Sequence, residues 1–372
     1  MIGYKFMGKA HTHAYHDVNL FFPETLVPRR MLLCGRDERG VAEAASKLGW
    51  ERWTTDWKEV VSDPEIDLVD INAPSNVHKE IAIEALRNGK HVLCEKPLAV
   101  SLSDAREMLA AAENANVRHM ICFNYRFIPA VRLAKQLLDE GRIGEVRQYR
   151  GWFLQDWLTD EHAPFVWRLD RSIAGSGAHG DLNAHTVDLA RYLIGEIEEV
   201  SGISRTFVKY RVEPGHGSGE SRQRTVDVDD ATSFLAAFSN GAMGTFEASR
   251  AAGGRRCSNG FEIHGSKGSL RFDFERMNEL ELYEGSDDPY VQGYRTIQAT
   301  ESCHPYMEAW WPAGHGLGFE HTFIHAVLEL LEAVRTGREC IPNFADGVKC
   351  QQILDAVDRS IELRRWVKVE EL

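Results

Sequence analysis

The chain has 372 residues, 43% of them hydrophobic and 27% charged, which is the composition of a folded globular protein and not of a disordered one. At roughly 150 residues per domain, this length predicts two domains. The sequence carries 43 basic and 56 acidic residues, a net charge of −13, without a clustered basic stripe. We therefore expect neither nucleic acid nor a membrane as a partner, and no apolar run approaches the roughly 20 residues that would cross a bilayer.

Cysteine usage and the first residues indicate where the protein works. Seven cysteines are scattered without a Cys-x-x-Cys pair, and residues 1–8 hold no basic segment followed by an apolar one. Reduced thiols and the lack of a secretory pattern lead us to expect a cytoplasmic protein. No set of Cys, His and carboxylate residues has the spacing of metal ligands, so we expect no metal site.

Short apolar runs alternate with amphipathic stretches over the first 125 residues, a pattern typical of βαβ units in a parallel sheet. The predicted strands are Arg30–Cys34, Leu68–Ile71, His91–Cys94 and His119–Phe123. The predicted helices between them are Gly40–Lys47, Asn76–Asn88 and Ser103–Asn114.

The character of the sequence changes after about Pro129. The predicted helices are Ala130–Glu140, Asp181–Ile194, His321–Thr336 and Gly347–Arg365. The predicted strands are Glu145–Phe153, Ala231–Phe238, Gly241–Ser249, Asn259–His264, Ser269–Asp273 and Glu279–Tyr283. The Asn-Gly pair within Ser239–Ala242 predicts a hairpin turn, because it tolerates positive φ angles. The fold class is therefore α/β: a Rossmann domain with a doubly wound parallel sheet over residues 1–126, and an α+β domain with a mostly antiparallel open sheet over residues 127–372.

Two glycines near the start lie where a nucleotide-binding turn would join a first strand to a helix. Gly3 and Gly8 match the first and last glycines of the G-x-G-x-x-G pattern, but Lys5 occupies the middle position. Those glycines permit a tight turn and close approach to a pyrophosphate at a helix N-terminus. The strand before Gly3 would be only Met1-Ile2, so we expect the natural chain to begin further upstream.

The residues after the second strand affect whether NAD or NADP binds. An acidic side chain usually holds the ribose hydroxyls there, but this sequence has Gly35 followed by Arg36. The glycine leaves room for a 2′-phosphate and the arginine can pair with it, which favours NADP. Alternatively, Arg36 stacks on the adenine while Asp37 or water serves the ribose. NAD and NADP therefore both stay open.

Six motifs occur in a characteristic order along nearly the whole chain. They are Ile71–His78, Ala85–Pro97 with its Glu95-Lys96-Pro97, Phe123–Arg126, Gly177–His185, Asp188–Tyr192 and Phe344–Gly347. In this order they resemble the Gfo/Idh/MocA family of glucose–fructose oxidoreductases, inositol dehydrogenases and their relatives. A nearer resemblance, to the branch of levoglucosan dehydrogenases and glycoside 3-dehydrogenases, rests on Gly8–His11, Leu154–Trp157, Trp167-Arg168, Ser172–Gly177 and His304–Tyr306.

The resemblance implies NAD or NADP as the cofactor and Lys96, Asp181 and His185 as the catalytic group. The residues expected to contact the cofactor are Gly3, Phe6, Met7, Gly8, Gly35, Arg36, Ala73, Pro74, Asn76, His78, Glu95, Lys96 and Arg126. Glu95-Lys96-Pro97 ends an apolar strand, where open α/β sheets place their ligands. Arg126 has an alternative interpretation as part of a salt bridge at the domain boundary.

The chemistry of alcohol oxidation agrees with that catalytic group. Asp181 and His185 are four residues apart, so both project from one face of a regular helix. An imidazole with an ordinary pKa of about 6.5 can accept the hydroxyl proton, and a nearby carboxylate can orient the ring. The Lys96 ammonium can stabilise the developing alkoxide. In isolation, Asp-x-x-x-His is more often a helix-surface pair or a pair of zinc ligands than a catalytic pair.

The expected substrate is a secondary alcohol of a sugar, anhydrosugar or cyclitol, from which hydride passes to NAD(P). The residues expected to bind it are Lys96, Asp156, Trp157, Asp181, His185 and His304. An aromatic face and a carboxylate suit a carbohydrate, whose C–H faces stack on rings and whose hydroxyls need acceptors; structural packing of Trp157 is the alternative. We expect domain 127–372 to bind this substrate and to mediate assembly into a homo-oligomer, a dimer or tetramer.

Two other functions stay open. One is a glycosidase that uses bound NAD for a transient oxidation followed by elimination, as some members of the family do. The other is a non-catalytic NAD(P)-binding regulator. The presence of Lys96, Asp181 and His185 argues against the regulator, because a sensor does not need a proton acceptor.

Overall fold

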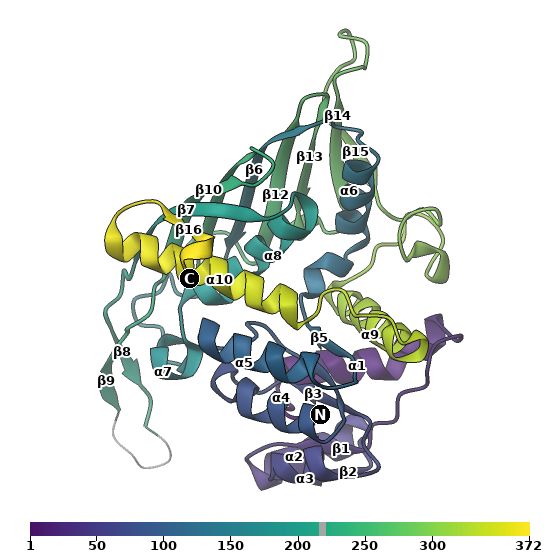
Figure 1. Cartoon of the computed structure of the whole chain (residues 1–372), viewed down its shortest axis with the longest axis vertical. Coiled ribbons are helices and arrows are strands. Elements are labelled where there is room, and N and C mark those ends of the chain that lie inside the picture. The colour runs from purple at the N-terminus through teal and green to yellow at the C-terminus, as the bar shows by residue number, and fades with distance from the viewer. Residues whose placement is uncertain (216–220) are drawn as a thin grey trace. The chain divides into compact units, whose positions relative to one another are not determined.

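The computed structural model describes residues 1–215 and 221–372 (Figure 1). The chain forms two compact units: unit 1 is Met1–Phe127 with Leu317–Lys349, and unit 2 is Ile128–Gly316 with Cys350–Leu372. The first boundary lies one residue from the predicted one. Residues 317–349, which we placed in the second domain, belong instead to unit 1, because α9 (Phe319–Thr336) packs along α1 (Phe6–Phe21). The Phe6 and Phe319 rings stack with their centroids 6.0 Å apart.

Unit 1 is built on a parallel sheet. Its strands are β1 (Leu32–Cys34), β2 (Arg52–Thr54), β3 (Leu68–Ile71), β4 (His91–Cys94) and β5 (His119–Ile121). β1 pairs with β2, and β4 lies between β3 and β5. Ile2 joins the two sets through parallel bridges to Cys34 and Ile71, and its backbone N–H donates to the Asp70 carbonyl over 2.8 Å. The strand order is therefore β2-β1-Ile2-β3-β4-β5, which confirms the doubly wound parallel sheet.

Helices connect these strands, with apolar residues on the faces that cover the sheet. They are α2 (Glu38–Leu48), α3 (Trp57–Ser62), the 3₁₀ turn η1 (Ser75–Val77), α4 (His78–Arg87), α5 (Leu102–Glu113) and η2 (Asn124–Phe127). Side-chain caps begin two of them: Asp56 accepts from the Lys58 N–H, and Ser101 accepts from the Asp104 N–H. Helix α10 (Phe344–Leu363) starts in unit 1 and ends in unit 2.

Unit 2 is built on a nine-stranded sheet in the order β15-β14-β13-β12-β6-β11-β10-β7-β16. The strands are β6 (Val146–Leu154), β7 (Ile197–Arg205), β10 (Ala231–Phe238), β11 (Met243–Ser249), β12 (Ser258–Gly265), β13 (Gly268–Asp273), β14 (Glu279–Glu284), β15 (Arg295–Gln298) and β16 (Val367–Lys368). All pairs are antiparallel except β6 with β11, which run parallel. The predicted Asn-Gly hairpin joins β10 to β11. A separate hairpin pairs β8 (Tyr210–Glu213) with β9 (Arg222–Thr225).

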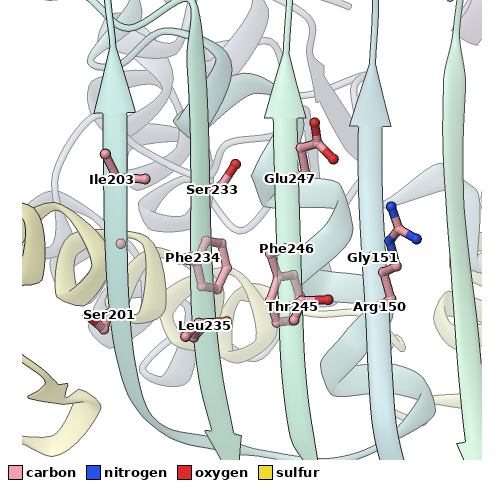
Figure 2. Close-up of a pocket in the computed structure, with 11 residues that line it drawn as sticks. Arg150, Gly151, Ser201, Ile203, Ser233, Phe234, Leu235, Thr245, Phe246 and Glu247 are labelled. Atoms are coloured by element: carbon pink, nitrogen blue, oxygen red, sulfur yellow. The ribbon is translucent and has the colours of Figure 1, made fainter.

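One face of the large sheet is covered and the other is open. Helices α6 (Pro129–Asp139), α8 (Ala184–Leu193) and the second half of α10 lie against the covered face (Figure 1). The stacked rings of Phe234 and Phe246 are buried on this face. The open face carries a hollow lined by residues of β6, β7, β10 and β11 (Figure 2). None of the residues that line this hollow is a predicted site residue.

The remaining elements of unit 2 are short. They are η3 (Trp167–Leu169), α7 (Arg171–Ala174), the π-helical turn η4 (His179–Asn183), and the 3₁₀ turns η5 (Phe274–Arg276), η6 (Met307–Ala309) and η7 (Val369–Glu371). In the described part of the chain, no helix is long and apolar enough to span a membrane.

Candidate active site

Two glycines of the first turn are required by its geometry. Gly3 has a φ of +106°, and a Cβ on it would lie 2.5 Å from the Asn72 carbonyl oxygen. A Cβ on Gly8 would lie 2.2 Å from the Gly3 carbonyl oxygen, so only glycine lets α1 start this close to the turn. This cradle lies at the switch point of the sheet, between β1 and β3, where doubly wound folds bind dinucleotides. The residues present therefore fit a dinucleotide, although Lys5 replaces the middle glycine.

The space beside Gly35 is taken by an aromatic ring. A Cβ on Gly35 would lie 2.2 Å from the Tyr4 ring, and the Tyr4 hydroxyl faces Asp37, which with burial raises the pKa of Tyr4. The Tyr4 ring therefore fills the space that a side chain at position 35 would take. Arg36 is exposed beside it.

Loops after β3 and β4 carry several predicted cofactor residues. Ala73 and Pro74 are half-buried and Asn76 is exposed. His78 is buried, and its ring nitrogens lie 2.9 Å from the Ala73 carbonyl oxygen and 3.0 Å from that of Pro97. The ring thus joins the two loops, which gives His78 a structural task beyond the predicted contact with cofactor.

Lys96 follows β4 and is half-buried, next to the buried Glu95. One Glu95 carboxylate oxygen accepts from the Lys96 backbone N–H over 3.1 Å. The other lies 3.1 Å from Nε2 of His11, on α1. His11 Nδ1 in turn lies 2.9 Å from Asp70, and the Cys122 sulfur lies 3.7 Å from Nε2. Sequence spacing did not reveal this cluster, because its residues come from α1, from β3 and from the segments directly after β4 and β5.

The other predicted cofactor residues of unit 1 lie in the turn after β5 or in α1. Arg126 is buried and forms an ion pair with Asp346 at 3.2 Å, which supports its alternative interpretation as a salt-bridge residue. Phe6 is exposed and stacks on Phe319, and Met7 is half-buried in the first turn of α1.

In unit 2, the parallel pairing of β6 and β11 brings two loops together. Because both strands end at the same edge, with Leu154 opposite Ser249, the segments that follow them lie side by side. The Gln155 N–H donates to the Ser249 carbonyl over 2.8 Å, and the Leu158 N–H donates to the Arg250 carbonyl over 2.9 Å. This edge positions the Trp157 ring, which is partly exposed, and the Arg250 side chain beneath it.

Arg250 connects two of the predicted substrate residues. Its side chain is 1% exposed, donates to the Asp181 carboxylate over 2.7 Å, and also donates to the Arg168 carbonyl over 3.3 Å. Its guanidinium carbon lies 5.4 Å from the centre of the Trp157 ring, within range of a cation–π interaction. Asp156 lies 3.4 Å from the exposed Arg256. We did not predict Arg250; the signal was an arginine directly after an alternating strand, but only the pairing of β11 with β6 shows what it faces.

The helix that carries Asp181 and His185 differs from the prediction. We expected one regular helix over Asp181–Ile194, but Asp181 lies in the π-helical turn η4, and α8 begins at Ala184. The Asp229 carboxylate accepts from the Gly177 and His179 N–H groups at 2.9 and 2.8 Å, and so holds the start of this turn. Asp181 and His185 therefore lie in consecutive helical segments and not in one regular α-helix.

The remaining predicted residues also lie in unit 2. His185 is buried in the first turn of α8, with its ring centre 5.8 Å from that of Phe153 on β6. His304 is half-buried and accepts from the Glu301 N–H over 3.1 Å, and burial lowers the pKa of His304. Lys96 belongs to unit 1, whereas Asp181 and His185 belong to unit 2.

Two family matches cover most of the chain. Residues 1–123 match the oxidoreductase family with an NAD-binding Rossmann fold, and residues 131–271 match the GFO/IDH/MocA C-terminal domain. Together with the doubly wound sheet and the open nine-stranded sheet, these matches define a two-domain, NAD-binding oxidoreductase. Levoglucosan dehydrogenase of Pseudarthrobacter phenanthrenivorans is 41% identical over 382 aligned residues, which cover 100% of this chain and 98% of that one. The chain belongs to the Gfo/Idh/MocA family, which confirms the resemblance seen in the sequence.

Other relatives agree. The scyllo-inositol 2-dehydrogenase (NAD(+)) of Bacillus subtilis is 37% identical over 242 residues, 63% of this chain and 64% of that one. A solved structure of levoglucosan dehydrogenase in complex with NADH and levoglucosan has a TM-score of 0.96 at 41% identity, covering 100% of this chain and 98% of that one. An oxidoreductase domain protein from Kribbella flavida has a TM-score of 0.95 at 48% identity, covering 99% and 97%.

Proposed function

We propose that the protein is an NAD(P)-dependent dehydrogenase that oxidises a secondary hydroxyl of an uncharged sugar, anhydrosugar or cyclitol. The observation that carries this proposal is the edge where β6 and β11 end, which sets the Trp157 ring, Arg250 and Asp181 together. An aromatic face beside a carboxylate acceptor is the combination that a pyranose or cyclitol needs. The levoglucosan and inositol dehydrogenases among its relatives act on ligands of this class.

The charges of this cluster favour a neutral substrate. Asp181 is paired with Arg250, and Asp156 with Arg256, so neither arginine offers an uncompensated charge to a phosphate or carboxylate. Pairing with Arg250 also keeps Asp181 an acceptor of hydrogen bonds from substrate hydroxyls. Sugar phosphates and sugar acids should therefore be poorer substrates than the corresponding neutral sugars.

The catalytic roles follow from the side chains. When bound, NAD(P) supplies a two-electron acceptor that takes the hydride from the carbinol carbon. His185 accepts the hydroxyl proton, so that the C–O bond becomes a carbonyl, and Asp181 anchors a substrate hydroxyl. The Lys96 ammonium stabilises the oxygen while the proton leaves. Gly3 and Gly8 would let the first turn approach the pyrophosphate, and Arg36 would meet the adenosine end.

A panel assay tests the proposed function. The purified protein is incubated with NAD or NADP and with levoglucosan, glucose, myo-inositol, scyllo-inositol and glucose 6-phosphate, and reduced nicotinamide is followed by its absorbance. We expect reduction with at least one neutral member of the panel. No reduction with any of them would contradict the proposal, whereas free sugar released from a glycoside without net NADH would favour the NAD-dependent glycosidase.

Calorimetric titration of the same protein with NAD and NADP decides between the cofactors. We propose that Arg36 supports NADP binding comparable with NAD binding, and that Arg36→Ala weakens NADP selectively. NAD bound more than about a hundredfold tighter than NADP, roughly 2.7 kcal/mol, would contradict this. The ring of Tyr4 over Gly35 is the feature that would then explain the exclusion of the 2′-phosphate.

The Arg250–Asp181 pair gives a prediction about stability and substrate affinity. Arg250→Met keeps the apolar stem but removes both hydrogen bonds of a buried cation. We expect the free energy of unfolding to fall by about 1–3 kcal/mol and the KM for the sugar to rise, because Asp181 loses the partner that orients it. Thermal unfolding and steady-state kinetics measure the two effects. Arg256→Met, at a side chain that is 87% exposed, is the matched control and should leave stability unchanged. Wild-type stability and KM in Arg250→Met would refute this role.

We also propose that the protein works in the cytoplasm as a homo-oligomer. No disulfide joins any of its seven cysteines, all of which lie in the described residues, as expected in a reducing compartment. The open face of the large sheet presents Ile203 and Leu235, each at least half exposed (Figure 2). Arg150 and Glu247 lie on the same face on neighbouring strands, so a two-fold related copy can pair them reciprocally. Light scattering should give the mass of two or four chains; the mass of one chain would contradict this.

A further inference from the structure

The described residues include a buried group of titratable side chains in unit 1 that the proposed chemistry does not use. His11 is 1% exposed on α1, Asp70 is 3% exposed on β3, and Cys122 is 1% exposed after β5. Glu95, at the end of β4, is 7% exposed. Four separate segments thus converge on one imidazole ring, and the ring of Phe323 on α9 covers it at 5.2 Å between centroids.

The geometry identifies the form of this imidazole. Nδ1 lies 2.9 Å from one Asp70 oxygen, and Nε2 lies 3.1 Å from one Glu95 oxygen. Both distances are those of hydrogen bonds, and an ionised carboxylate can only accept, so both ring nitrogens carry a proton. Burial acts to lower the pKa of His11, but the charge of Asp70, the Cys122 sulfur and the hydrogen bonds to them outweigh it and raise that pKa well above its ordinary value.

The same group has the residue types of a metal site. His11, Glu95 and Cys122 each place one ligand atom within 4.8 Å of the others. A metal, however, needs an unprotonated nitrogen and a thiolate, whereas both His11 nitrogens face carboxylates and burial raises the pKa of the Cys122 thiol to about 12. The proton on Nε2 therefore takes the place that a metal would need.

Glu95 links this group to the proposed catalytic lysine. Its first carboxylate oxygen faces His11, and its second accepts from the Lys96 backbone N–H over 3.1 Å. The Glu95 N–H donates to the Ile71 carbonyl over 3.0 Å, which ties the backbone to β3. Without His11, the Glu95 carboxylate would be buried beside Asp70 without its cation, and both groups would repel each other or take up a proton.

We propose that His11 is a positioning residue: as an imidazolium it joins Asp70 to Glu95 and so holds Glu95 in the orientation that fixes the backbone of Lys96. The role of Lys96 in this inference rests on the proposed function. The positive charge of His11 does not depend on that function. The imidazolium couples the helix of the nucleotide-binding turn to the loop that carries the proposed alkoxide-stabilising ammonium.

The kinetic test is a double-mutant cycle. His11→Gln removes the positive charge and keeps a hydrogen-bond donor, and Glu95→Gln removes the charge that His11 holds. We expect each single variant to lower kcat about tenfold to a hundredfold, because small displacements of a catalytic group have such effects. The double variant should be no worse than Glu95→Gln alone. For His11→Gln, which changes no predicted cofactor contact, the affinity for NAD measured by calorimetry should change less than threefold, or roughly 0.7 kcal/mol.

His325→Gln is the matched control, since His325 is equally buried in unit 1 but lies against the Phe127 carbonyl at 2.9 Å. Its kcat should stay at the wild-type value. The proposal would be overturned if the fold decreases in kcat of the two single variants multiplied in the double variant. A folded His11→Gln variant with wild-type kcat would also overturn it. One equivalent of zinc in the purified protein would overturn it as well.

The stability test does not depend on activity. The titratable groups that face His11 are Asp70, Glu95 and Cys122, and Tyr15 interacts in turn with Asp70 and Cys122. Because its pKa is raised in the folded state, His11 stabilises fully below the ordinary histidine pKa and loses this contribution as pH rises through the folded pKa. The gap in Tm between wild type and His11→Gln should therefore be wide at pH 6 and shrink in alkaline solution. A difference in Tm that does not change with pH would show that His11 is not an imidazolium and would overturn the proposal. A wild-type protein that is inactive on every sugar would refute only the proposed function.

Discussion

His185→Ala is expected to lower turnover about 10²–10⁴-fold at neutral pH, because the variant has no group to accept the hydroxyl proton. His185 is buried in the first turn of α8, beside the Phe153 ring. The affinity for NAD, measured by calorimetry, should stay close to the wild-type value, since His185 lies in unit 2 and the nucleotide cradle in unit 1.

The pH dependence of kcat is a second test of His185 as the base. In the oxidative direction, kcat of the wild type should rise as the imidazole loses its proton, because only the neutral ring accepts one. This rise should be absent in His185→Ala. His264→Ala, at a half-exposed histidine on β12, is the control and should keep both kcat and the profile. Near-normal turnover in His185→Ala on the best substrate would show that another group is the base.

Lys96→Ala is expected to damage turnover at least as strongly. The alkoxide that forms while the proton leaves would lose the cation that stabilises it, and electrostatic stabilisation of this kind is often worth about 10²–10³ in kcat. NAD affinity should change less than kcat. Lys96→Arg, which keeps the charge but not the compact ammonium, should recover only part of the activity.

Steady-state kinetics and calorimetry on Lys96→Ala and Lys79→Ala check this expectation. Lys79 lies on α4 and forms exposed ion pairs with Asp104 and Glu107, so its loss should leave kcat unchanged. Equal kcat in Lys96→Ala and in the wild type would remove Lys96 from the proposed catalytic group and, with it, the role we assign to His11.

Elements with a strong local signal were predicted well. β3, β4 and β10 have the predicted bounds, because each is a run of buried or alternating apolar residues between turn residues. β2 was missed because Arg52–Thr54 is a short strand at the sheet edge, mostly exposed. β7, which contains Glu198 and Glu199, and the β8–β9 hairpin lack such a run and were missed as well. These strands are specified by their neighbours and not by their own composition.

The sequence by itself determined the family, the Rossmann domain and the order of the motifs, because turn glycines, strand periodicity and motif spacing are local properties of the chain. Only the tertiary structure decided three features: the π turn at Asp181, the pairing of Asp181 with Arg250, and the convergence of His11, Asp70 and Glu95. Each of these depends on residues from separate helices, strands and loops that meet only when the sheets form. Strand order and register set such meetings, and neither can be read from the spacing of residues along the chain.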